Sequence, residues 1–257
     1  AEVAADLPSR TEALIRVTPA ESERTTYDHL HLALRSDVAR LVGGPNTVPI
    51  SILEVLLRLR QACCDSALLP GAPAGLPPSS KTQVLIHKIR ELVEEGHLCL
   101  VFSQWTRYLD RITLALDEAG ITHLRIDGTT QNRGALVAQF QDQSPGQTAP
   151  PVFLLSLKAG GVGLTLTAAD HVFILDPWWN PAVEDQAADR AHRIGQDKPV
   201  FIHRLVAENS IEERVLALQA RKRAIASQVL DPNPGSGESS SLARPELTRE
   251  DLLELLS

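Results

Sequence analysis

The chain has 257 residues, of which 43% are hydrophobic and 22% are charged, a composition typical of globular domains and sufficient for a sizeable core. Its formal net charge of −7 argues by itself against nucleic-acid binding, because phosphate contacts depend on clustered Lys and Arg. No apolar run approaches the roughly 20 residues of a membrane-spanning helix, and no signal-peptide layout is present. We therefore expect no membrane partner and a cytoplasmic location, at the nucleoid if the protein is bacterial.

The chain contains no Met, so we expect it to be part of a longer or processed protein. Its cysteines, Cys63, Cys64 and Cys99, lack the spacing of a zinc site, and their odd number argues against a disulfide framework. We interpret them as reduced structural residues and expect no metal site in this chain.

The first 80 residues are predicted to form a helical segment and a linker. Apolar residues recur at helical spacing from His29 to Val42 and from Ile50 to Cys63. Pro and Gly then concentrate between Pro70 and Ser80, as is typical of a linker. The pattern therefore places a domain boundary at residue 80.

Residues 81–230 are predicted to form an α/β domain. Apolar, strand-like runs alternate there with amphipathic helical patterns, which indicates a parallel sheet with helices on both faces. Central parallel strands are buried on both faces, which explains why these runs are continuously apolar. The expected strands cover residues 98–102, 124–126, 152–155, 171–175 and 200–205.

The C-terminal part of the chain is predicted to contain one long helix and a third, separate region. Ser210 and Glu213 have the spacing of a capping box, and an apolar stripe follows them as far as Val229. Residues 231–245 are rich in Ser, Gly and Pro and are expected to be disordered, with a short acidic helix at 250–256 behind them. We treat residues 231–257 as a linker with a terminal helix.

The loops that follow the strands are the candidate functional sites, because ligands of such sheets bind outside the carboxyl ends of the strands. These loops contain SQW (103–105), DGTT (127–130), SLKAGGVGLTL (156–166) and DPWWNP (176–181). In the glycine-rich loop, Ser156 and Lys158 offer a hydroxyl and an ammonium beside backbone amides, which suits an anion. A tight strand-to-helix turn also needs glycine for geometry alone, so both interpretations stay open.

A helix is predicted after DPWWNP, and it places Gln186, Arg190 and Arg193 at i, i+4 and i+7 on one face. Guanidinium is planar, permanently charged and bidentate toward phosphate, so this face suits a transferring phosphoryl group. The alternative is a surface pair between Asp189 and Arg193, with Arg190 in solvent.

Taken in order, the segments VFSQW, IDGTT, LLSLKAGGVGLTLTAADHVFILDPWWNP, QAADRAHRIGQ and HRLVAENSIEERV resemble the C-terminal helicase motifs of the Swi/Snf-type family. The resemblance covers about residues 50–230. LLRLRQACCDSALLP is similar to the family segment that ends in a Cys-Asn-His-Pro-like run, although Cys64, Asp65 and Ser66 alter its polar end.

The resemblance implies a RecA-like C-terminal lobe of an ATP-dependent double-stranded DNA translocase. It implies that Arg190 and Arg193 are arginine fingers toward the γ-phosphate, and that Gln186 helps couple two lobes at the nucleotide. Gly161 and Gly163 match the glycine-containing turn near the nucleotide and the DNA backbone. The residues that match the loops lining the DNA groove are Ser103, Gln104, Trp105, Ser156, Lys158, Trp178 and Trp179.

Some features depart from the family pattern. The element from Gly128 to Phe140 is shorter than usual, which leaves a DNA contact by Arg133 open, and one of Trp178 and Trp179 is expected to pack its loop. The sequence has no GxxxxGK[ST] motif, so ATP and Mg²⁺ are expected to be held by an N-terminal RecA-like lobe, and this chain alone should be inactive. The competing hypothesis is a non-catalytic DNA- or protein-binding α/β module.

Overall fold

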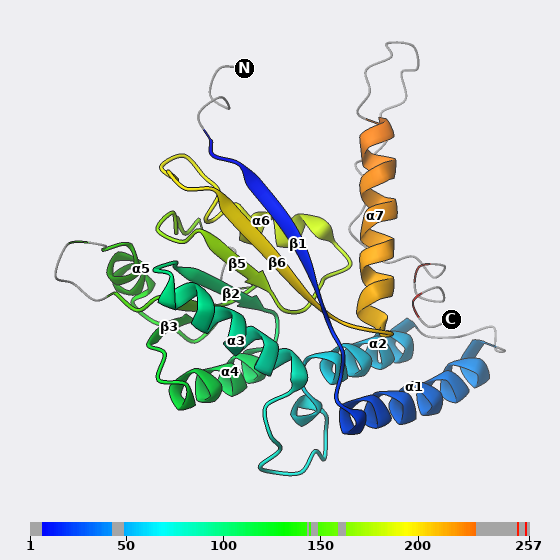
Figure 1. The fold of residues 1–257 in the computed structure, drawn as a ribbon. Coiled ribbons are helices and arrows are strands. Elements are labelled where there is room, and N and C mark those ends of the chain that lie inside the picture. The colour runs from blue at the N-terminus through cyan, green and yellow to red at the C-terminus, as the bar shows by residue number, and fades with distance from the viewer. Residues whose placement is uncertain are drawn as a thin grey trace, which may run out of the picture.

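The computed structural model describes residues 7–42, 49–142, 144, 149–158, 163–229, 251 and 255. Six strands form one parallel sheet in the order β1-β6-β5-β2-β4-β3 (Figure 1). The strands are β1 (Arg10–Val17), β2 (Cys99–Ser103), β3 (His123–Ile126), β4 (Val152–Ser156), β5 (His171–Ile174) and β6 (Val200–Ala207). The helices are α1 (Glu21–Val42), α2 (Pro49–Cys64), η1 (Ser66–Leu68, a 3-10 helix), α3 (Ser80–Glu94), α4 (Thr106–Glu118), α5 (Arg133–Gln141), α6 (Pro181–Ala188) and α7 (Ile211–Val229).

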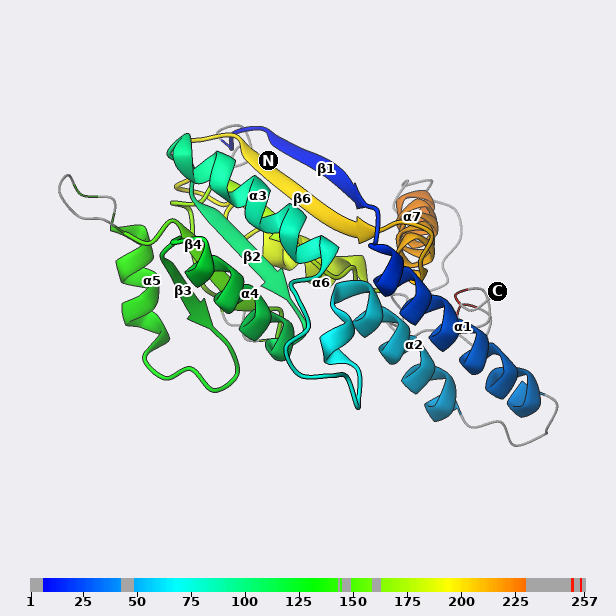
Figure 2. The same ribbon diagram turned by 60° about the horizontal axis from the view of Figure 1, so that its bottom comes forward.

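The sheet buries both of its faces, as the continuously apolar runs predict. Val101 and Leu154 point into one core with α3 and α4, whereas Phe102 and Leu155 point into the other with α5 and α6. Figure 2 shows α3 and α4 lying across the first face. Because successive strand residues point to opposite faces, every position in β2 and β4 has to be buried. The predicted parallel α/β sheet with helices on both faces is confirmed.

Strand β1 departs from the sequence-based expectation, which places only helices before residue 80. Residues Arg10–Val17 pair in parallel with β6, from Arg10 opposite Val200 to Val17 opposite Ala207. Only Val17 of this edge strand is buried, so its sequence lacks the apolar run that marks the central strands. Its pairing depends on a partner about 190 residues away, which local periodicity does not report.

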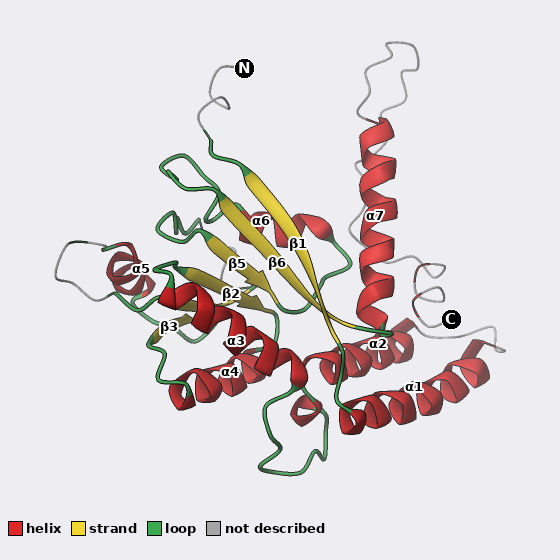
Figure 3. Cartoon of the chain, in the orientation of Figure 1, coloured by secondary structure: helices red, strands yellow, loops and turns green. Residues whose placement is uncertain are grey.

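The helices α1, α2 and α7 form a separate cluster beside the sheet (Figure 3). Because α1 follows β1 and α7 follows β6, this cluster lies at the carboxyl end of the sheet. Helices α1 and α2 confirm the two helices expected in the N-terminal segment, and the linker ends where Ser79 Oγ caps α3 by accepting from Thr82 N (3.2 Å). The domain boundary at residue 80 stays a prediction.

Helix α7 begins where the capping pattern predicts, but with different contacts. Ser210 Oγ accepts from Glu212 N (3.2 Å), and the Glu213 carboxylate accepts from Asn209 N (3.1 Å). Each bond is displaced by one residue from a capping box, and Asn209 has a positive φ of 51° that turns the chain into the helix.

The C-terminal predictions fall largely outside the described residues. This is so for the disorder expected at 231–245 and for most of the helix expected at 250–256. Of the latter, Leu255 is buried in the cluster with α7, and Asp251 pairs with Arg221 and Lys222. Within the described ranges, no helix is long and apolar enough to cross a membrane.

Candidate functional site

The loops after β2 and β4 meet at the carboxyl end of the sheet, as the parallel topology requires. Ser103 and Ser156 are register partners and both side chains are buried. Ser103 Oγ accepts from Trp105 N (3.1 Å), and its carbonyl accepts from Leu157 N (2.9 Å). The two serines therefore shape these loops from within.

The segment from Asp176 to Asn180, called the tryptophan loop below, is attached to the SQW loop by a buried carboxylate. Asp176 is fully buried and accepts from Gln104 N at 3.0 and 3.3 Å. Burial raises the pKa of Asp176 to about 6, although the nearby Arg60 guanidinium opposes this rise.

Arg60 of α2 clamps the tryptophan loop from the helical cluster. It is 1% exposed, and its Nη2 donates to Pro177 O (2.8 Å) while its Nη1 donates to Gln104 Oε1 (3.2 Å). The guanidinium carbon lies 4.7 Å from the ring centroid of Trp178 and 5.1 Å from that of Trp179. A buried cation is thus held by amide oxygens and indole faces, and it links α2 to two loops of the sheet.

The two indoles of the tryptophan loop also stack on each other. Their ring centroids are 3.8 Å apart, and both side chains are partly buried. Trp179 packs against the cluster of α1, α2 and α7, which agrees with the expectation that one tryptophan packs the loop.

A second buried carboxylate, Glu184 of α6, holds the other side of the tryptophan loop. Glu184 is 0% exposed and accepts from Trp178 N (2.8 Å), from Arg204 Nε of β6 (2.8 Å) and from Gln219 Nε2 of α7. Arg204 also pairs with Glu12 of β1 at 2.6 Å. The loop is therefore bonded to α6, β6 and α7, and through Arg204 to the edge strand.

A buried ion pair secures the strand that leads into the tryptophan loop. Lys81 Nζ of α3 donates to Leu175 O (2.9 Å) and lies 2.6 Å from the carboxylate of Glu212 in α7. Burial is the largest influence and disfavours the ammonium, but the charge of Glu212 and its hydrogen bond, with contributions from Cys64 and Cys63, together raise the pKa of Lys81.

Residues 189–195, called the arginine turn below, differ from the prediction. Helix α6 ends at Ala188, so Arg190 and Arg193 lie in the turns that follow it and do not share a helix face with Gln186. The physical reason is a tertiary bond: the Arg190 side chain turns inward, and its Nη1 donates to Leu164 O (3.2 Å) in the glycine-rich loop. The prediction of one face is therefore wrong, but the structure brings Arg190 and the glycine-rich loop together.

The arginine turn holds positive charge that the described residues leave without a carboxylate partner. Arg190 is 6% exposed, and its Nε is buried without a hydrogen-bond partner in the described part of the chain. Burial, and then the charge of Arg193, lowers the pKa of Arg190. The alternative pair of Asp189 with Arg193 is replaced by a contact between Asp189 and Arg10 (3.1 Å).

Comparison with known proteins identifies this arrangement. Residues 80–195 match the family model "Helicase conserved C-terminal domain". The chain is 44% identical over 154 residues to DNA repair protein RAD5A of Arabidopsis thaliana, covering 59% of the chain and 15% of that protein. It is 39% identical over 208 residues to an uncharacterized ATP-dependent helicase of Mycoplasma pneumoniae, covering 80% of the chain and 19% of that protein.

Solved structures agree with these relatives. The Sulfolobus solfataricus SWI2/SNF2 ATPase core in complex with dsDNA superimposes with a TM-score of 0.72 and 27% identity, covering 88% of this chain and 47% of that one. The C-terminal part of the Fun30 ATPase domain shares the fold, with a TM-score of 0.69, 24% identity and coverage of 83% and 89%. This chain is a C-terminal helicase lobe of the Swi/Snf type. It spans between 13% and 25% of the length of the curated relatives that it matches.

Four further residues that the sequence assigns to the site of the Swi/Snf lobe are exposed to solvent. Lys158, Gln186 and Arg193 are exposed, and Gly163 is exposed with a positive φ of 37° that favours glycine. Gly161 lies outside the described residues.

Arg133 has a local role in the Swi/Snf lobe. Its Nη2 donates to Asp127 O (3.2 Å) and its Nε to Thr130 O (3.3 Å), which closes the DGTT loop onto α5. The question of a DNA contact by this residue stays open.

Sequence reasoning missed the buried charges that support the tryptophan loop. Arg60 lies in a helix whose neighbouring positions Leu56 and Leu59 are buried, so a guanidinium within an apolar stretch is a signal that local reading can detect. Glu184 has no such signal, since its partners come from β6 and α7.

Proposed function

We propose that this lobe supplies arginine fingers and DNA-backbone contacts to an ATPase site that an N-terminal RecA-like lobe completes. The observation that carries the proposal is the arginine turn, where Arg190 and Arg193 lie close enough for one charge to lower the pKa of the other. Within the described ranges neither forms an ion pair with a carboxylate. Since an uncompensated buried cation is costly, an anionic ligand is the group that suits this turn.

The bonding of Arg190 favours a phosphate over a simple counter-ion. Its Nη1 holds Leu164 O, which fixes the guanidinium plane against the glycine-rich loop, and its Nε has no partner among the described residues. A guanidinium that is oriented before the ligand arrives loses little entropy on binding, and its planar fork matches phosphate oxygens. Arg190 and Arg193 are therefore suited to stabilise charge that develops on a transferring phosphoryl group.

ATP with Mg²⁺ would supply the free energy of phosphoryl transfer at this site. The sequence has no GxxxxGK[ST] motif, so we assign the grip on the β- and γ-phosphates and on Mg²⁺ to the N-terminal lobe. We assign the positive charge of this lobe to the arginine turn and the contact with the facing lobe to Gln186 of α6, whose exposed side chain supports the assignment. Alone, it should not hydrolyse ATP.

We further propose that the loops at the carboxyl end of the sheet grip the DNA backbone. The exposed ammonium of Lys158 is the direct phosphate contact. Gln104, Trp105, Trp178 and Trp179 form the adjoining surface, while the buried Ser103 and Ser156 hold its loops in place. The named DNA complex of a structural relative supports this assignment. Because the chain has a net charge of −7, its own affinity for duplex should be weak and salt-sensitive.

The deciding experiment is DNA-stimulated ATP hydrolysis by the complete protein that contains this chain. Arg193→Ala is the cleanest variant, because this side chain is exposed and the fold does not depend on it. We expect kcat to fall by at least about 100-fold, the loss typical of one charge-stabilising donor. The matched control is Arg90→Ala, an exposed arginine of α3, which should leave turnover unchanged. Unchanged turnover in Arg193→Ala and Arg190→Ala would favour the non-catalytic binding module.

A further inference from the structure

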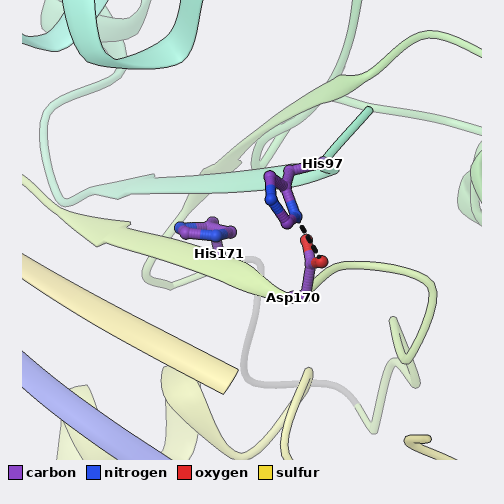
Figure 4. A group of neighbouring side chains, drawn as sticks. All are labelled: His97, Asp170 and His171. Carbon is purple, nitrogen blue, oxygen red and sulfur yellow. Dashed lines mark hydrogen bonds and ion pairs between the residues drawn. The ribbon is translucent and has the colours of Figure 1, made fainter. Parts of the chain in front are cut away.

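A second group of polar side chains lies at the amino end of the sheet, opposite the loops described above. His97 precedes β2, and Asp170 and His171 stand at the start of β5 (Figure 4). One potential ligand atom from each residue lies within 4.8 Å of the other two. We propose that His97, Asp170 and His171 form a binding site for a divalent transition-metal ion of the Zn²⁺ class. No such site is expected from the cysteine pattern, because this one uses no cysteine.

The donor set suits this class of ion. Two imidazoles and one carboxylate provide three ligands and leave a position open for water, a common arrangement for Zn²⁺. His97 Nδ1 and Asp170 Oδ2 are 2.7 Å apart and share a hydrogen bond, and the rings of His97 and His171 are 4.7 Å apart. Two ligands of a tetrahedral Zn²⁺ lie roughly 3.3 Å apart. Binding therefore requires the His97 and Asp170 ligand atoms to move slightly apart and the three ligand atoms, which lie within 4.8 Å of one another, to adjust to that spacing. The metal replaces the proton between His97 and Asp170, and this proton leaves to solvent.

Neighbouring groups already orient the ligands. His171 Nδ1 is hydrogen-bonded to His203 Nε2 (2.9 Å), which leaves Nε2 of His171 as its metal-binding atom. Asp170 Oδ1 accepts from Leu98 N (3.2 Å), which holds the carboxylate beside His97. Such outer contacts fix ring orientation and ligand basicity in metal sites.

The site is open to solvent on the side of His97, whose side chain is 34% exposed, whereas that of Asp170 is 3% exposed. Lys198 Nζ lies 3.7 Å from Asp170 Oδ2, and its side chain is 57% exposed. This ammonium lies beside the carboxylate but can move into water, so it competes with the metal ion for the carboxylate of Asp170. Since the cluster joins the starts of β2 and β5, a bound ion would cross-link two central strands and stabilise the lobe.

The test is Zn²⁺ binding to the complete protein after treatment with a chelator, followed by calorimetry and by thermal unfolding. We expect one ion bound through this site and a higher Tm with Zn²⁺, because a ligand that binds only the folded state stabilises it. His97→Gln should weaken this binding at least about tenfold and reduce the Tm shift at the same Zn²⁺ concentration. His97 is partly exposed, so we expect this variant to fold. Asp170 is buried, so the folding of Asp170→Asn has to be checked before its Zn²⁺ affinity is compared.

Two controls make the result specific. His87→Gln removes an exposed histidine of α3 that lies 3.3 Å from Glu91, and it should leave the affinity unchanged. Lys198→Ala should tighten Zn²⁺ binding severalfold by removing the competing cation. Equal affinity in wild type and His97→Gln, or an equal loss in His87→Gln, would overturn the proposal. Visible absorption of Co²⁺ typical of tetrahedral sites, present in wild type and lost in His97→Gln, would support it.

Discussion

The tryptophan loop and the arginine turn are separated only by helix α6, yet they differ in how their charged side chains are paired. In the tryptophan loop, backbone groups meet buried Arg60, Asp176 and Glu184, each held by several partners. In the arginine turn, the Nε of Arg190 is buried without a hydrogen-bond partner among the described residues, and Arg193 is exposed. In the first region the buried Arg60 lies near the carboxylate of Asp176, although Arg60 Nε, like Arg190 Nε, has no hydrogen-bond partner among the described residues. In the second region, no described carboxylate pairs with Arg190 or Arg193.

This difference has a physical meaning. A buried ionic group that is paired with an opposite charge and held by several hydrogen bonds is costly to disturb, so it fixes the position of the surface above it. An under-neutralised cation contributes little to stability and gains most when an anion arrives. Substitutions in the tryptophan loop should therefore affect stability first, and substitutions in the arginine turn should affect turnover first.

The largest effect is expected for Arg190→Ala in the complete protein. This change removes a charge from the proposed ATPase site together with the bond to Leu164 O. We expect DNA-stimulated kcat to fall by about 1,000-fold or more, equivalent to about 4 kcal/mol of barrier, with a smaller change in unfolding free energy. Steady-state ATPase assays and urea titrations of the same preparation measure both. If Arg190→Ala loses stability but keeps its specific activity, the arginine turn affects stability first, contrary to our expectation.

The next effect is expected for Arg60→Ala, which should act on stability. It leaves Gln104 Oε1 and Pro177 O without this donor and opens a space beside the stacked indoles. The unfolding free energy should fall by about 3 to 5 kcal/mol, as when one partner of a buried charged contact is removed. The control is Arg58→Ala on the same helix, whose pair with Glu54 at 3.3 Å is exposed, and it should cost less than about 1 kcal/mol.

The stability of the tryptophan loop should depend on pH through the buried carboxyl group of Asp176. Burial raises the pKa of Asp176 to about 6 from 3.8, so its folded form holds a proton more tightly than its unfolded form. The stability that this provides is complete below about pH 4 and is lost as the pH rises through 6. Relative to Asp176→Asn, which does not ionise, wild type should therefore lose about 2 to 3 kcal/mol between pH 4 and 7. Urea midpoints measure this difference. A gap that is constant with pH would contradict it, and the exposed control Asp197→Asn should follow wild type.

The smallest effect is expected for Lys158→Ala, which tests the proposed DNA contact of the glycine-rich loop, outside both compared regions. Duplex affinity of the complete protein should fall by less than about 1 kcal/mol, and the slope of log K against log salt should decrease by about 1. Fluorescence anisotropy at several salt concentrations measures both quantities. Lys88→Ala on α3 is the control. An equal loss of duplex affinity in this variant would contradict the assignment of Lys158 as a phosphate contact.

The central strands could be predicted from the sequence because burial on both faces favours apolar residues at successive positions of the strand. Val101 and Phe102 point to opposite faces and are both apolar, so β2 appears as a continuous run. Strand β1 was not predictable in this way, since it is a half-exposed edge strand that pairs with β6. The end of α6 was also missed, because the inward turn of Arg190 depends on Leu164 O in another loop.

By itself, the sequence determined the family, the α/β class and the loops at the carboxyl end of the sheet, because motif order and apolar periodicity are properties of neighbouring residues. The tertiary structure alone decided which charges are satisfied and which are not. Arg60 meets Pro177 from 117 residues away, and Lys81 meets Glu212 from 131 residues away. A hydrogen bond or ion pair depends on distance in space, and for these side chains only the packing of helices on the sheet sets that distance.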